Sequence, residues 1–214
     1  MYTKKCGHLS ILCGPMWSSK STELAAKISK YADLGMKCLF INHAFDDRTD
    51  SKDTTDDGKF SRHGTSSFQL SSKICKIKTS DLSRITISEY DAIAIDECQF
   101  FGMDLLEEVP KWVNIYHKVV LCAGLDGDAE CKKFGYLLDL IPYADKVQKL
   151  RAKCTVCLEE LRKTDFRGVG AIKAKAPFSA RIVETTLTGQ VQVGGSETYT
   201  SMCRYHHQQH IQSS

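Results

Sequence analysis

The chain has 214 residues, of which 42% are hydrophobic and 26% are charged. This length accommodates one full domain with a small appendage, and the composition excludes wholesale disorder. The formal net charge of +3 comes from 29 basic and 26 acidic residues, which is too balanced to predict a broad basic face for nucleic acid. No segment approaches the roughly 18 consecutive apolar residues that a membrane helix needs, and the first residues lack the apolar stretch of a secretory signal.

Alternating apolar runs and helix-like stretches predict an α/β fold with a parallel sheet covered by helices. The predicted strands are residues 9–13, 38–41, 74–77, 92–95 and 119–122. A helix is expected over residues 20–34 and is ended by Gly35, and a second helix over 103–116 is expected to be interrupted or kinked near Pro110. Residues 44–72 have little periodicity, as functional or mobile loops do.

Ten cysteines are many for this length. Secreted disulfide scaffolds are shorter and denser in cysteine, so we expect a reducing compartment and a cytoplasmic protein. Six cysteines lie in or beside apolar runs, where cysteine behaves as a small buried hydrophobe: Cys6, Cys13, Cys38, Cys75, Cys98 and Cys122.

A phosphate-binding loop is predicted between the first strand and the first helix. The segment consists of Gly14, Pro15, Met16, Trp17, Ser18, Ser19, Lys20, Ser21 and Thr22. It follows the pattern GxxxxGK[ST] except that Ser19 replaces the second glycine. A helix N-terminus attracts phosphate, Lys20 would reach the outer phosphates, and the Ser21 hydroxyl would bind Mg²⁺. Serine in place of glycine costs roughly 1 kcal/mol where the backbone is left-handed, so we expect reduced but surviving phosphate affinity. An ordinary strand–turn–helix junction is the alternative.

Two acids, Asp96 and Glu97, end the apolar strand at residues 92–95. An acid in this place contacts Mg²⁺ in P-loop enzymes. Neighbouring side chains on a strand point to opposite faces, so the second acid can serve as general base for a substrate hydroxyl. The alternative is that both acids only solvate the strand end.

A structural zinc site is predicted from two knuckles, CxxC at Cys154 and Cys157 and CxxH at Cys203 and His206. Paired knuckles bring four ligands together with tetrahedral geometry. His207 is an alternative fourth ligand because its spacing also works.

Together these features resemble the thymidine kinases of the zinc-containing, P-loop type, the cytosolic and poxvirus-like class. The resemblance rests on LxxGPMxSSKSTEL, DExQFF at 96–101, AGLDGD at 123–128, FG at 134–135, ADKV at 144–147, VGGxxxYxSxCR at 193–204 and the two knuckles. It implies a P-loop NTPase-like parallel sheet flanked by helices, with a small C-terminal zinc-binding lasso domain. The implied division is 1–150 for the ATP-binding domain, 151–207 for the lasso over the nucleoside and 208–214 for a polar tail.

The resemblance also implies the site residues. Glu97 would be the catalytic base, and Ser21 with Asp96 would hold the Mg²⁺ that accompanies ATP. Besides the phosphate loop, ATP would contact Asp46, Arg48, Asp96, Glu97, Cys98 and Gln99. The nucleoside would contact Met16, Phe100, Leu125, Phe134, Phe178, Ser179, Gln192, Val193 and Tyr199. The zinc ligands would be Cys154, Cys157, Cys203 and His206.

The implied reaction is ATP-dependent 5′-phosphorylation of thymidine, and of deoxyuridine, for nucleotide salvage. A homotetramer with dTTP as feedback inhibitor, and no nucleic-acid or membrane partner, is expected. Two departures favour an alternative, a catalytically weakened homologue that binds without turnover: Ser19 in the phosphate loop, and Ala129 where an aromatic ring often faces the base. A zinc-dependent binding module for nucleic acid or protein is a second alternative, although the knuckles are only mildly basic.

Overall fold

The computed structural model describes residues 6–45, 59–60, 68–70, 72–163, 174–183 and 197–213. The chain divides into two compact units. The first, here called the sheet unit, comprises Met1–Leu12, Ser21–Gly124 and Gly135–Gln148. The second, here called the cysteine unit, comprises Cys13–Lys20, Leu125–Phe134 and Lys149–Ser214.

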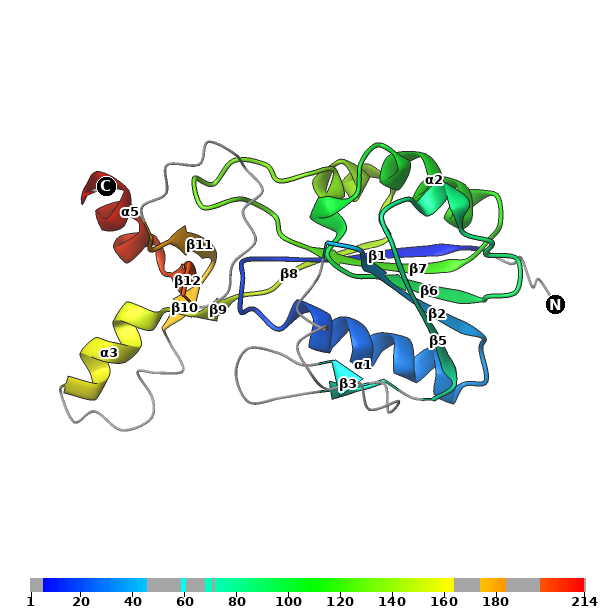
Figure 1. Ribbon diagram of the computed structural model, residues 1–214, viewed down its shortest axis with the longest axis horizontal. Helices are drawn as coiled ribbons and strands as arrows, with labels where there is room; N and C mark the ends of the chain where they lie inside the picture. Colours follow the sequence, from blue (N-terminus) through cyan, green and yellow to red (C-terminus); the bar gives the residue numbers. More distant parts are fainter. Residues whose placement is uncertain are drawn as a thin grey trace. The chain divides into compact units, whose positions relative to one another are not determined.

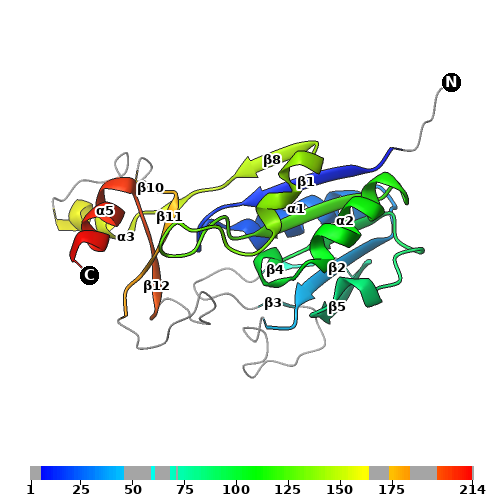
Figure 2. The same cartoon turned by 90° about the horizontal axis from the view of Figure 1, so that it is seen from above.

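A six-stranded parallel sheet, with the order β5-β2-β6-β7-β1-β8, forms the centre of the sheet unit. In Figure 2, β5 and β8 lie at its two edges. Cys38 pairs with Ile74 on one side and with Ala92 on the other, and both neighbouring strands run parallel to β2. The strands are β1 (His8–Cys13), β2 (Cys38–His43), β5 (Ile74–Thr79), β6 (Ala92–Ile95), β7 (Val119–Gly124) and β8 (Lys146–Lys149). The parallel α/β fold is therefore confirmed. Only β8, a polar edge strand, was not expected.

Two helices cover opposite faces of the sheet, α1 (Lys20–Asp33) and α2 (Asp104–Asn114) (Figure 1). Gly35, at φ +84°, ends α1 as expected, because the amides of Gly35 and Met36 then reach back to the carbonyls of Ala32 and Tyr31. The expected interruption of α2 is wrong. The helix runs through Pro110 to Asn114.

The core of the sheet unit is built from bulky side chains. Leu24 and Ile28, four residues apart on α1, are fully buried beside Phe40 and Leu121 of the sheet. On the other face, α2 buries Leu105, Val109, Trp112 and Val113. The central strand β6 is buried along its whole length, as expected for a parallel strand covered on both faces.

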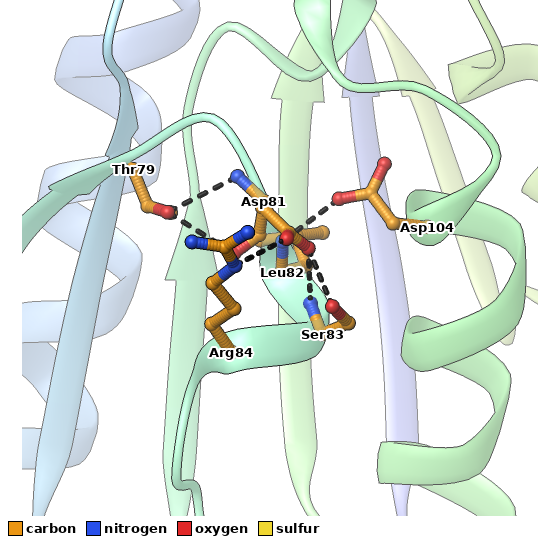
Figure 3. Close-up of polar contacts among 6 residues, drawn as sticks. All are labelled: Thr79, Asp81, Leu82, Ser83, Arg84 and Asp104. Carbon is orange, nitrogen blue, oxygen red and sulfur yellow. Dashed lines mark hydrogen bonds and ion pairs between the residues drawn. The ribbon is translucent and has the colours of Figure 1, made fainter.

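A network of hydrogen bonds ties the turn after β5 to the start of α2 (Figure 3). The Asp81 carboxylate accepts the amide of Ser83 at 3.0 Å and its hydroxyl at 2.6 Å, and it pairs with Arg84 at 2.9 Å. These contacts, the Ser83 hydroxyl first, hold the pKa of Asp81 below its ordinary value. Asp104, the first residue of α2, accepts the amide of Leu82 at 2.8 Å. The short helix η2 (Leu82–Arg84) is thereby fixed to α2.

The cysteine unit has small sheets and two helices, α3 (Thr155–Lys163) and α5 (Arg204–Ser213). Strand β11 (Phe178–Arg181) pairs antiparallel with β12 (Tyr199–Met202), and β9 (Ala152–Lys153) pairs with β10 (Lys175–Ala176). Its buried cluster consists of small side chains and one methionine: Ala152, Cys154, Ala174, Ala176, Ala180 and Met202. In the sheet unit, the short strands β3 (Lys59–Phe60) and β4 (Phe68–Gln69) pair with each other.

All ten cysteines are unpaired. Cys13, Cys38, Cys98 and Cys122 are buried as expected, but the expectation is wrong for Cys6 and Cys75, which are exposed. Cys6 precedes β1, and Cys75 lies on the edge strand β5, where one face of the strand is open to water. No helix among the described residues is long and apolar enough to cross a membrane.

Candidate functional site

The predicted phosphate loop joins β1 to α1 and contains backbone that favours glycine at three positions. A Cβ atom at Gly14 would lie 2.6 Å from the carbonyl oxygen of Leu150, so only glycine fits. Trp17 and Ser19 adopt φ of +65° and +63°, in the left-handed region that strains side-chain-bearing residues. Ser19 therefore stands where the backbone prefers the glycine of the general pattern.

Polar groups inside the loop hold its shape. The Lys20 ammonium donates to the Pro15 carbonyl at 2.7 Å and lies 3.5 Å from the Ser18 hydroxyl, which donates to the same carbonyl at 2.8 Å. Lys20 is 9% exposed. The Thr22 hydroxyl oxygen is buried and has no hydrogen-bond partner among the described residues. A buried hydroxyl without a partner is uncommon in proteins, and this one lies in the first turn of the helix that follows the loop.

The two acids differ in burial and in backbone conformation. Asp96 is 4% exposed, and its carboxylate accepts the amide of Glu97 at 3.0 Å. Glu97 is half-buried and has left-handed backbone, with φ 52° and ψ 42°. A non-glycine residue in this conformation is uncommon and clusters at functional sites.

Gln99 fixes the carboxylate of Glu97. Its amide donates to Glu97 Oε2 at 2.6 Å, and the Gln99 side chain is itself buried. Close packing holds Gln99: a Cβ at Gly124 would lie 2.7 Å from its Oε1, and a Cβ at Gly135 would lie 2.3 Å from its carbonyl oxygen. The sequence prediction had placed Gln99 at the phosphates and had no sign of this bond to Glu97. Cys98 is fully buried, and burial raises the pKa of its thiol well above the ordinary value.

Phe100, which was predicted to line the nucleoside pocket, belongs to a group of aromatic side chains around His43. The buried ring of His43 lies 5.7 Å from Phe100, 4.6 Å from Phe101 and 5.1 Å from Phe45. His43 Nδ1 accepts the amide of Phe45 at 3.1 Å. The sequence prediction missed His43, because a single histidine at the end of an apolar strand carries no motif.

Several predicted nucleoside contacts lie together within the cysteine unit. The Met16 amide donates to the Ser179 hydroxyl at 3.0 Å. The Phe178 ring lies 4.9 Å from His207 and 4.8 Å from the Arg204 guanidinium. Tyr199 is buried, with Arg181 5.9 Å from its ring. Of the others, Phe134 is buried and Leu125 is half-buried, whereas Asp46, Arg48, Gln192 and Val193 lie outside the described residues.

Four side chains converge in the cysteine unit as the knuckle spacing predicted. The Sγ atoms of Cys154, Cys157 and Cys203 lie 3.5, 3.4 and 3.3 Å from His206 Nδ1, and Cys157 lies 3.8 Å from Cys203. All four ligand atoms lie within 4.8 Å of one another. Tetrahedral zinc with bonds of about 2.3 Å to sulfur and about 2.0 Å to nitrogen separates its ligands by roughly 3.5–3.8 Å. The cluster therefore fits one zinc ion.

The surroundings of this cluster favour a structural metal. His206 Nε2 lies 3.3 Å from the Glu160 carboxylate, which is the usual outer partner of a metal-binding histidine. Burial, followed by hydrogen bonds with the neighbouring thiols, raises the pKa of Cys157 to about 12. Burial acts to raise the pKa of Cys203, but hydrogen bonds, including one with the backbone of His206, outweigh it and lower this pKa below the ordinary value.

His207, the alternative ligand, is not part of the cluster. Its Nε2 lies 3.2 Å from the Ala129 carbonyl oxygen and 3.9 Å from Cys131 Sγ. The geometry thus selects His206 from the two adjacent histidines.

Comparison with known proteins gives a consistent result. Residues 7–207 match the family model described as thymidine kinase. The thymidine kinase of Vaccinia virus (strain Western Reserve) is 32% identical over 201 residues, covering 92% of this chain and 95% of the viral protein. The cytosolic thymidine kinase of Bos taurus is 32% identical over 203 residues, covering 94% and 72% of the two chains. The Monkeypox virus thymidine kinase is 31% identical over 198 residues.

Proposed function

The chain belongs to the thymidine kinase family, and on that premise we propose that it transfers the γ-phosphoryl group of ATP to the 5′-hydroxyl of thymidine, and of deoxyuridine. The observation that carries the proposal is the family match over residues 7–207, which includes the phosphate loop, both acids and all four cluster residues. A cytoplasmic homotetramer inhibited by dTTP belongs to the same proposal, by the family resemblance alone.

The proposed reaction assigns one acid to the substrate proton. Glu97 accepts the proton of the 5′-hydroxyl, whose oxygen forms a bond to the γ-phosphorus while the bond to the β–γ bridging oxygen breaks and ADP leaves. The 2.6 Å bond from the Gln99 amide holds the Glu97 carboxylate in position for this proton transfer. A positioned general base contributes roughly 10²–10⁴-fold to rate.

Lys20 is proposed to hold the outer phosphates of ATP. Its buried ammonium donates to the loop carbonyl of Pro15, so the cation lies inside the loop that would surround the phosphates. Ser21 and Asp96 would hold Mg²⁺, because hydroxyl and carboxylate oxygens are its preferred ligands. When bound, this ion neutralises charge on the transferring phosphoryl group.

Cys154, Cys157, Cys203 and His206 would hold a zinc ion that has only a structural role. Four protein ligands would complete the tetrahedral coordination of zinc, so no position would remain for a substrate. Zinc would therefore fix the two ends of the segment between the knuckles.

Thymidine-dependent ADP production by zinc-replete protein tests the proposal. Lys20→Ala should abolish turnover, whereas Lys27→Ala, a change on the same helix at a lysine paired with Glu23, should not. Glu97→Gln should lower kcat by roughly 10²–10⁴-fold, and the exposed Glu89→Gln should leave it unchanged.

Three outcomes are distinguishable. Turnover that is lost in Lys20→Ala and Glu97→Gln supports the proposal. Thermal stabilisation by thymidine or dTTP without turnover would instead favour the weakened homologue, with strain at Ser19 as its physical basis. Neither turnover nor stabilisation would contradict thymidine phosphorylation.

A further inference from the structure

The loop from Leu125 to Phe134 contains a rigid turn. The Asp128 carboxylate accepts the amides of Glu130 at 3.0 Å and Lys132 at 2.8 Å. The Asp128 amide donates to the carbonyl of Lys132 at 3.0 Å, and the Cys131 amide donates to the carbonyl of Asp128 at 3.2 Å. Cys131 completes the turn with φ of +62°. Because these bonds close the turn on itself, holding one of its residues holds the others.

Contacts within the cysteine unit hold this loop. Before the turn, Asp126 forms an ion pair with Lys149. In the turn, the carbonyl oxygen of Ala129 lies 3.2 Å from Nε2 of His207. A carbonyl can only accept, so the imidazole donates. His207 is 3% exposed, and its ring lies 4.9 Å from Phe178, so the donor itself cannot swing away.

We propose that His207 is a positioning residue for the nucleoside site, because it holds the loop Leu125–Phe134 to the helix that carries the zinc ligand His206. This inference rests on the proposed function, in which Leu125 and Phe134 line the thymine pocket. The two adjacent histidines then have separate tasks: His206 contributes Nδ1 to the metal cluster, and His207 fixes the loop.

In this arrangement Ala129 contributes its backbone carbonyl and not its side chain. The side chain of Ala129 is too small to hold the loop by packing, and its backbone carbonyl accepts the bond from His207 instead. Fixing a binding loop before the ligand arrives lowers the entropy cost of binding. His207 should therefore affect thymidine affinity and leave the chemical step unchanged.

The proposal is tested with three variants of the full-length, zinc-replete protein: His207→Ala, His207→Gln and Gln208→Ala. His207→Gln retains an N–H donor, and Gln208 is an exposed neighbour on α5. For each variant, hydrogen exchange of the peptide 125–134, zinc content, and KM and kcat for thymidine are measured.

His207→Ala should speed amide exchange in residues 128–132 and raise the KM about five- to tenfold, the loss expected for one buried hydrogen bond. Zinc content and kcat should stay unchanged, His207→Gln should recover part of the KM, and Gln208→Ala should match the parent protein.

Unchanged exchange and KM in His207→Ala would overturn the proposal, and loss of zinc would assign His207 to the metal site instead. Faster loop exchange in a protein without thymidine kinase activity would support the hold on the loop and reject the proposed function.

Discussion

Different interactions stabilise the interior of each of the two units of the chain. The sheet unit buries large apolar side chains such as Phe40, Leu24 and Trp112. The cysteine unit buries four alanines, one methionine and a cysteine in its cluster. Burial stabilises in proportion to apolar area, at about 25 cal/mol per Å², and alanine contributes little area. Ligation of zinc by three cysteines and a histidine would replace the missing core.

The largest expected effect comes from removing one ligand. Cys203→Ser should release zinc and unfold the cysteine unit while the sheet unit stays folded, because structural zinc contributes on the order of 10 kcal/mol in small domains. Zinc analysis and amide exchange measure both effects. The control is Cys75→Ser, since Cys75 is exposed and lies outside the cluster. A folded, metal-free Cys203→Ser protein would show that the small core suffices.

The converse change removes a large side chain from the sheet unit. Phe40→Ala should lower the free energy of unfolding by about 3–5 kcal/mol, because Phe40 is 1% exposed and the change leaves a cavity. Zinc content should remain that of the parent. Leu34, which is 79% exposed, provides the matched control, and Leu34→Ala should change stability by less than about 0.5 kcal/mol.

Gln99 is a place where the sheet unit positions a group by a hydrogen bond instead of apolar packing. Gln99→Leu should lower kcat about 10- to 100-fold, because a hydrogen bond to a charged group is worth about 1.5–3 kcal/mol. Gln99→Glu should be at least as slow, since it places a second carboxylate beside Glu97. Steady-state kinetics measure the effect, and an unchanged kcat in Gln99→Leu would reject the role of Gln99.

The smallest expected effect is at Ser19. Ser19→Gly should raise the free energy of unfolding by roughly 1 kcal/mol, because glycine removes backbone strain at φ +63°. Ser19→Ala keeps the Cβ atom and should not show this gain. Denaturant unfolding distinguishes the two variants, and equal free energies of unfolding in Ser19→Gly and the parent would remove strain as a factor.

Local sequence patterns predicted most of the sheet unit. The apolar run of β6 and the Gly35 stop after α1 depend on neighbouring residues only, and both were found as expected. Pro110 shows the limit: the pattern predicted an interruption or a kink, but the helix is not interrupted, and it buries Val109, Trp112 and Val113 on either side of the proline. Cys75 was misjudged because the position of β5 at the sheet edge is a property of the whole fold.

The candidate site was predictable where a motif defines it. The knuckle spacing identified Cys154, Cys157 and Cys203, but it could not choose between His206 and His207, because that choice depends on how α5 presents its residues. The sequence also could not predict the hydrogen bond from Gln99 to Glu97. The bond forms where the backbone of Glu97 is left-handed, and no residue type in that segment indicates such a conformation.

The most direct measurement follows amide exchange across the whole chain before and after zinc is removed by a chelator. If zinc replaces an apolar core in the cysteine unit, protection in β9, β11, β12 and α5 will be lost, while β2, β6 and β7 will keep theirs. Unchanged protection in the cysteine unit would contradict a structural role for the metal. An equal loss of amide protection in both units would show that zinc does not stabilise the cysteine unit selectively.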